Sequence, residues 1–110
     1  MIYHLGIFAA AAICEIAGCF AFWLWMKRGA SGWVAALGVV SLIAFAGLLS
    51  RIDVSFAGRA YAAYGGIYIA ASLAWLWIVE KQRPNTADVT GAAICVFGAL
   101  IILGFALRIK

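Results

Sequence analysis

Four long hydrophobic runs, separated by short polar stretches, make up almost all of the sequence. They cover residues 5–26, 32–49, 56–79 and 87–107. Each run has roughly the 20 residues that an α-helix needs to cross the hydrocarbon core of a bilayer. Because the connections are too short for a soluble domain, consecutive helices must be antiparallel neighbours. The pattern therefore predicts an all-α membrane protein with a single four-helix transmembrane domain over residues 1–110.

The composition agrees with a membrane protein and excludes a soluble core. Apolar residues make up 68% of the chain and charged residues 11%, whereas soluble domains are roughly 45–50% apolar. The first run is not typical of a cleaved signal peptide, since no Lys or Arg precedes it and no small-residue cleavage site follows it. The lipid bilayer is therefore an expected partner of this multi-pass protein. Tryptophans near the run ends fit an interfacial aromatic belt.

Two connections carry candidate helix caps. Pro84 precedes the fourth run, where Asn85 or Thr86 is a candidate N-cap and Asp88 falls in the first turn. Ser55 is a candidate cap for the third run. These positions predict where the third and fourth helices begin.

Positive charges are equally divided between the two membrane faces. With four spans, both termini and the second connection share one face, which carries Arg51, Arg59, Arg108 and Lys110. The opposite face carries Lys27, Arg28, Lys81 and Arg83. The positive-inside rule sets orientation by an imbalance, and here there is none. The chain is therefore expected to insert both ways, which makes an antiparallel homodimer available. The +4 net charge anchors helices at headgroups and does not indicate nucleic-acid binding.

Glu15 lies near the middle of the first run and is the strongest functional candidate. A charged carboxylate at the bilayer centre is costly, so it marks a functional site by default. Small residues on the same helix face, including Gly18, leave room beside it for a ligand. The alternative is a protonated Glu15 that hydrogen-bonds a neighbouring helix and holds the bundle together.

Tyr61, Tyr64 and Tyr68 form a stripe on the third run. Their hydroxyl groups can hydrogen-bond a carboxylate, and their rings can hold a cation over their faces. We therefore expect this stripe to face Glu15 and to form a proton- and substrate-binding site with it. The alternative is ordinary helix packing.

Two further features of the third run have open interpretations. Gly65 and Gly66 weaken the helix at its middle, which suits a hinge in a moving element, although close helix packing also explains them. Arg59 lies on the opposite helix face from the tyrosines. It either anchors the helix at the headgroups or contacts substrate.

The fourth run carries no intramembrane charge but has small residues on one face. Such residues let helices approach closely in a membrane. The predicted dimer contact consists of Gly91, Cys95, Gly98 and Ile102, with packing inside one chain as the alternative. The second run offers only Gly38, Ser41 and Gly47 as small positions and is assigned packing and a lining role.

These features favour a proton-coupled antiporter that exports cationic or amine-type molecules. Two Glu15 carboxylates facing one chamber would bind either protons or a cation, so that one drives out the other. No nucleophile–base pair indicates an enzyme, and the His and Cys residues lack metal-ligand spacing. No cofactor or metal is expected. The competing hypothesis is a non-transporting membrane subunit in which Glu15 is structural.

Several motifs resemble the YnfA family of small bacterial inner-membrane proteins. They are the segments 14–19, 23–28 and 58–66, together with Gly91-Ala92. That family is similar in turn to the small multidrug resistance transporters, four-helix antiparallel dimers with dual topology that exchange protons for cations. The resemblance implies the same fold, exchange and inner-membrane location.

The resemblance also implies roles for individual residues. Glu15 matches the essential first-helix carboxylate of those transporters, Tyr61 their third-helix tyrosine and Gly65-Gly66 their kink. The stripe from Gly91 to Gly98 matches their dimer contact. The drug exporters usually have tryptophan at the position of Tyr64 and an apolar residue at that of Arg59. The implied substrates therefore include both quaternary cations, such as viologens and dyes, and smaller amine or guanidinium-like compounds.

Overall fold

The structure, a computed structural model, describes residues 1–109 and contains four α-helices within them. They are α1 (Ile2–Arg28), α2 (Gly32–Leu49), α3 (Ala57–Ile78) and α4 (Thr86–Arg108). All four are long and apolar enough to cross a membrane. The predicted all-helical architecture with four spans is therefore confirmed. The structure holds one chain, so the homodimer stays a prediction.

The helix ends follow from local sequence. Gly29 adopts the left-handed conformation (φ 72°) after α1, and its N–H donates to the Leu24 carbonyl. Glycine suits this position because it has no Cβ to clash there. At the start of α4, the Asn85 side chain accepts a hydrogen bond from the Asp88 N–H (2.8 Å), and the Asp88 carboxylate accepts one from the Asn85 N–H (3.0 Å). This capping box identifies Asn85 as the N-cap.

The prediction that Ser55 caps the third helix is wrong. The helix begins at Ala57, and the capping position is held by Phe56, which has an extended backbone and makes no side-chain cap. Ser55 therefore lies one residue too far upstream for its hydroxyl to occupy the capping position.

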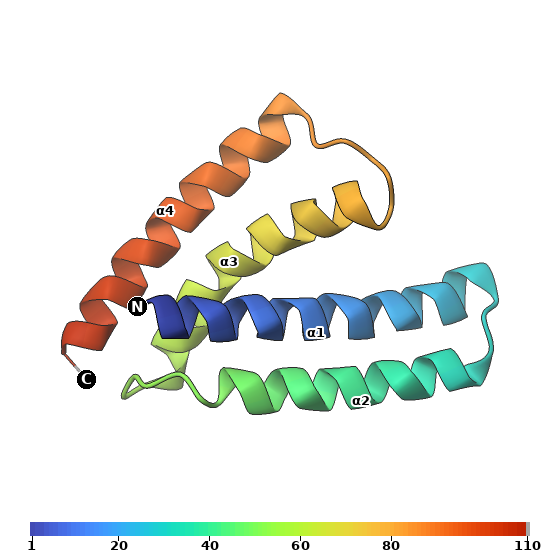
Figure 1. The fold of residues 1–110 in the computed structure, drawn as a ribbon, viewed down its shortest axis with the longest axis horizontal. Coiled ribbons are helices and arrows are strands. Elements are labelled where there is room, and N and C mark those ends of the chain that lie inside the picture. Colours follow the sequence, from blue (N-terminus) through green and yellow to red (C-terminus); the bar gives the residue numbers. More distant parts are fainter. Residues whose placement is uncertain (110) are drawn as a thin grey trace.

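The first two helices run antiparallel and side by side (Figure 1). They approach closely where glycines face each other: a Cβ at Gly18 would lie 2.9 Å from the carbonyl oxygen of Gly38. The Ser41 hydroxyl also donates a 2.6 Å hydrogen bond to the Cys14 carbonyl. Small residues and an interhelical hydrogen bond are the means by which helices associate in lipid, so this pair forms a firm support for Glu15.

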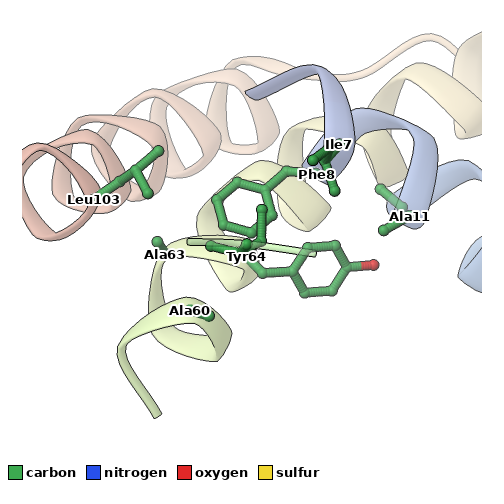
Figure 2. Packing of buried hydrophobic residues seen from close by; sticks show 9 residues of the cluster. Ile7, Phe8, Ala11, Ala60, Ala63, Tyr64 and Leu103 are labelled. Atoms are coloured by element: carbon green, nitrogen blue, oxygen red, sulfur yellow. The ribbon is translucent and has the colours of Figure 1, made fainter. Parts of the chain in front are cut away.

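The other two helices pair through a second close approach. A Cβ at Gly66 of α3 would collide with the Cys95 carbonyl and with Ala99 of α4. The N-terminal half of α3 then packs against α1 around Phe8 and Tyr64, and Figure 2 shows this cluster with Leu103 of α4 beside it. The packed core is small, and most large apolar side chains point outward, as lipid contact requires.

The start of α1, the end of α4 and the α2–α3 connection lie at one end of the bundle, and the other two connections lie at the opposite end (Figure 1). The first end carries Arg51, Arg59 and Arg108, and the other carries Lys27, Arg28, Lys81 and Arg83. The fourth charge assigned to the first end, Lys110, lies outside the described residues. The count of charges on each membrane face assumed that the α2–α3 connection lies at one end of the bundle and the other two connections at the opposite end. The structure has this arrangement.

Candidate functional site

Glu15 occupies the central position of α1, which runs from Ile2 to Arg28. It is half-buried, and its Oε1 atom accepts a hydrogen bond of 2.6 Å from the Tyr64 hydroxyl of α3. A hydrogen bond to a carboxylate at this depth stabilises charge that lipid alone would not solvate. The structure thus brings together Glu15 and one member of the predicted tyrosine stripe.

Aromatic packing fixes the orientation of Tyr64. Only 7% of the residue is exposed, and its ring centroid lies 5.8 Å from that of Phe8 and 5.6 Å from that of Phe45. Figure 2 shows the Tyr64 side chain reaching from α3 toward Ala11 of α1. Because three helices hold the ring, the hydroxyl group is presented to Glu15 by a rigid support rather than by a mobile side chain.

A cavity of about 590 Å³ extends from Glu15 to the α2–α3 connection. Glu15, Ser50, Tyr61 and Tyr64 supply its polar side chains. The remaining lining residues come from α2, the α2–α3 connection and the start of α3; they are Phe45, Ala46, Leu49, Ile52, Val54, Ala57 and Ala60. A ligand in this cavity would meet one carboxylate, two tyrosines, one serine and otherwise apolar walls. The predicted lining role of the second helix matches this arrangement.

Two predicted site residues lie outside this cavity. Tyr68 contacts the Tyr64 ring, with centroids 5.8 Å apart, but it lines a different cavity. Gly18 faces α2, where Gly38 and Leu42 fill the space beside it. Its lack of a side chain therefore serves helix packing, and it provides no room for a ligand next to Glu15.

The two hinge candidates differ sharply. Gly66 is buried against α4, whereas a Cβ at Gly65 would meet nothing within 4 Å. The helix continues without interruption from Ala57 to Ile78. The packing alternative therefore explains Gly66, while Gly65 has no contact that requires glycine.

Arg59 is exposed and does not line the cavity with Glu15. Its guanidinium carbon lies 5.8 Å from the centroid of the Phe56 ring. A cation over an aromatic ring near a helix end fits the headgroup anchor better than the substrate contact.

The predicted dimer residues of α4 divide into two groups. A Cβ at Gly91 or Gly98 would meet open space, and Ile102 is 38% exposed. Cys95 instead packs through its backbone against Gly66 of α3. Three of the four positions are thus available for a second chain, and one also serves packing inside this chain.

Sequence reasoning did not single out Phe45, Ile52 or Val54, although all three line the cavity. Their signal is weak because an apolar residue in a membrane helix looks the same whether it faces lipid or a cavity. The connection residues were assigned only to a loop. Among residues 1–109, no group of His, Cys, Asp or Glu side chains is arranged to hold a metal ion.

The family model described as "Uncharacterised BCR, YnfA/UPF0060 family" matches residues 1–109. The chain belongs to this family. A UPF0060 membrane protein of Ectopseudomonas mendocina is 58% identical over 96 residues, which cover 87% of each chain. A UPF0060 membrane protein of Pseudomonas paraeruginosa is 57% identical over 96 residues, covering 87% of this chain and 88% of the relative. No solved structure matches the chain.

Membership of the YnfA/UPF0060 family agrees with the structure. The two relatives are named as membrane proteins, and the four helices of this chain have the length and composition of membrane spans. The family resemblance stated from the sequence motifs is confirmed, and the protein is a multi-pass membrane protein.

Proposed function

We propose that this YnfA-family protein is a proton-coupled exporter of small cationic or amine compounds. The observation that carries the proposal is the position of Glu15. Its carboxylate lies at the centre of a spanning helix, accepts a hydrogen bond from Tyr64 and lines a cavity of about 590 Å³. This volume falls within the roughly 300–1,000 Å³ of ligand pockets.

The Glu15 carboxylate couples the movement of the proton to that of the cationic substrate because it binds one or the other, but not both at once. A carboxylate at this depth is stable when it is protonated or when it is paired with a cation. A substrate that enters the cavity pairs with the Glu15 carboxylate as the proton leaves, and the faces of Tyr61 and Tyr64 provide further attraction for the cation. When a proton returns to Glu15, it removes the counter-charge and releases the substrate. No bond in the substrate is made or broken.

An antiparallel homodimer in the bacterial inner membrane supplies access from both sides. The lining of the cavity in one chain extends from Glu15 to the α2–α3 connection, which lies at the end of the bundle where α1 starts and α4 ends (Figure 1). An inverted second copy places the same cavity on the other side of the membrane. The balanced charges permit both insertions, and α4 offers a surface at Gly91, Gly98 and Ile102 for the contact.

One observation favours a second candidate, a non-transporting membrane subunit. The hydrogen bond between Glu15 and Tyr64 joins α1 to α3, which is the structural role that a polar residue plays between membrane helices. In this case Glu15 is a packing residue, and function depends on a partner protein.

The Glu15→Gln variant separates the two candidates. Glutamine keeps an oxygen that accepts a hydrogen bond from the Tyr64 hydroxyl, but its amide cannot take up and release a proton as a carboxylate does. In liposomes with an internal pH dye, we expect the wild type to move protons when an organic cation such as methyl viologen is added, and Glu15→Gln to move none. Proton movement by Glu15→Gln at the wild-type rate would refute the role of Glu15 in proton exchange. Absence of cation-driven proton movement in the wild type itself would favour the non-transporting subunit.

A second measurement tests the orientation. Accessibility tags at the C-terminus should report from both sides of the bacterial membrane if both insertions occur. Tags on one side only would remove the antiparallel homodimer, while leaving the Glu15 chemistry to be tested separately.

A further inference from the structure

A second cavity, of about 300 Å³, lies between α1 and α3 and extends toward the opposite end of the bundle. Phe20, Trp23, Tyr68 and Trp75 contribute aromatic walls, and Glu80 lines it just beyond the end of α3. We propose that this cavity is a second binding site for small organic cations of the alkylammonium or quaternary ammonium class. The identification of this ligand with the transported substrate rests on the proposed function.

The lining has the chemistry that binds such cations. Aromatic faces attract a positive charge, most strongly for tryptophan, and two of the four rings are indoles. The rings of Phe20 and Trp75 meet at 68° with centroids 5.5 Å apart, so they form two sides of a corner rather than one flat wall. Glu80 supplies the counter-charge, and no Lys or Arg is among the described residues that line the cavity.

One of these rings already lies close to an ammonium group of the protein. The Lys27 Nζ atom lies 4.5 Å from the centroid of the Trp23 ring, well inside the roughly 6 Å over which this attraction acts. A free ammonium compound would use the same attraction from the cavity, supplemented by Trp75 and by the Glu80 carboxylate. The cavity volume is at the lower end for ligand pockets, which favours a small cation over a large polyaromatic one.

The second cavity is separated from the Glu15 cavity by two tyrosines. Tyr68 lines the second cavity, and its ring contacts that of Tyr64, which lines the first and holds Glu15. The two cavities extend toward opposite ends of one chain. In the proposed antiparallel dimer, each membrane face would therefore present the Glu15 cavity of one copy and the aromatic cavity of the other.

The test measures binding without transport. Glu15→Gln removes the counter-charge of the first cavity, and saturable binding of radiolabelled tetraethylammonium is then measured on the purified protein by scintillation proximity. We expect binding to persist in Glu15→Gln. Adding Glu80→Gln should weaken it roughly threefold, as for the loss of an exposed ion pair, and Glu80→Lys should weaken it roughly tenfold.

Asp88→Asn in the same background is the matched control. Asp88 is the other acid beside the α3–α4 connection, it does not line the cavity, and its backbone N–H still donates to the Asn85 cap. Binding in this control should stay within a factor of two. Trp23→Leu, at an exposed position, should weaken binding while the protein stays folded.

The outcomes separate this proposal from the proposed function. Absence of saturable binding in Glu15→Gln, or binding that Glu80→Lys leaves unchanged, would overturn the second site even if the wild type transports. Binding that persists in Glu15→Gln and depends on Glu80 supports the second site even if the wild type moves no protons.

Discussion

The hydrogen bond between Tyr64 and Glu15 can be removed with little other change. Tyr64→Phe deletes one hydroxyl group and keeps the ring, so the contacts with Phe8, Phe45 and Tyr68 are preserved. The hydroxyl donates to Glu15 Oε1 at 2.6 Å. Interhelical hydrogen bonds in membrane proteins contribute about 0.6 kcal/mol on average and at most about 1.7. We expect the free energy of unfolding to fall by an amount in this range.

The same variant should weaken cation binding. The hydroxyl stabilises the ionised carboxylate, and this is the form that pairs with a cation. A loss of about 0.6–1.7 kcal/mol corresponds to roughly 3- to 18-fold weaker binding. Stability is measured by reversible unfolding in mixed micelles, and binding by titration with an organic cation at fixed pH.

Tyr3→Phe is the matched control because Tyr3 is exposed near the start of α1 and lines neither cavity. Tyr3→Phe should leave the free energy of unfolding and the affinity for the cation unchanged. If Tyr64→Phe equals the wild type in unfolding and in binding, the hydrogen bond has no energetic role and the reasoning fails.

Two further pairs of variants test the fold. Gly66→Ala places a Cβ against Ala99 and the neighbouring backbone of α4, so it should lower the free energy of unfolding by about 1–3 kcal/mol. Gly65→Ala, where the space is open, should be neutral or stabilise by up to about 1 kcal/mol; equal effects of the two would contradict the packing of α3 on α4. Asn85→Ala should cost about 1 kcal/mol in the same assay through loss of the cap, whereas Ser55→Ala should cost nothing measurable. A cost for Ser55→Ala equal to that for Asn85→Ala would contradict the assigned start of α3.

The helices could be predicted because length and hydropathy alone decide which segments span a bilayer. The start of α4 was also foreseeable, since the Asn85–Asp88 box is encoded locally. The prediction that Ser55 caps α3 was wrong because a serine hydroxyl suits a cap, whereas the backbone becomes helical only at Ala57. Local chemistry identifies a type of residue suitable for a cap, and the path of the chain decides which residue occupies the position.

The candidate site was only partly predictable for a similar reason. Glu15 stands out as an acid in an apolar run, and the tyrosine spacing indicates a common face. The partner of a small residue cannot be read from its own helix, so Gly18 was assigned to the site although it faces α2. Trp23 and Trp75 fitted an interfacial belt, and only the packing of α1 against α3 places them around one cavity.

The central claim is that Glu15 exchanges a proton for a cation. The most direct test adds a saturating organic cation to purified protein in a weakly buffered solution that contains a pH indicator. We predict that the wild type and Asp88→Asn release protons on binding and that Glu15→Gln releases none. Proton release by Glu15→Gln equal to that of the wild type would contradict the claim.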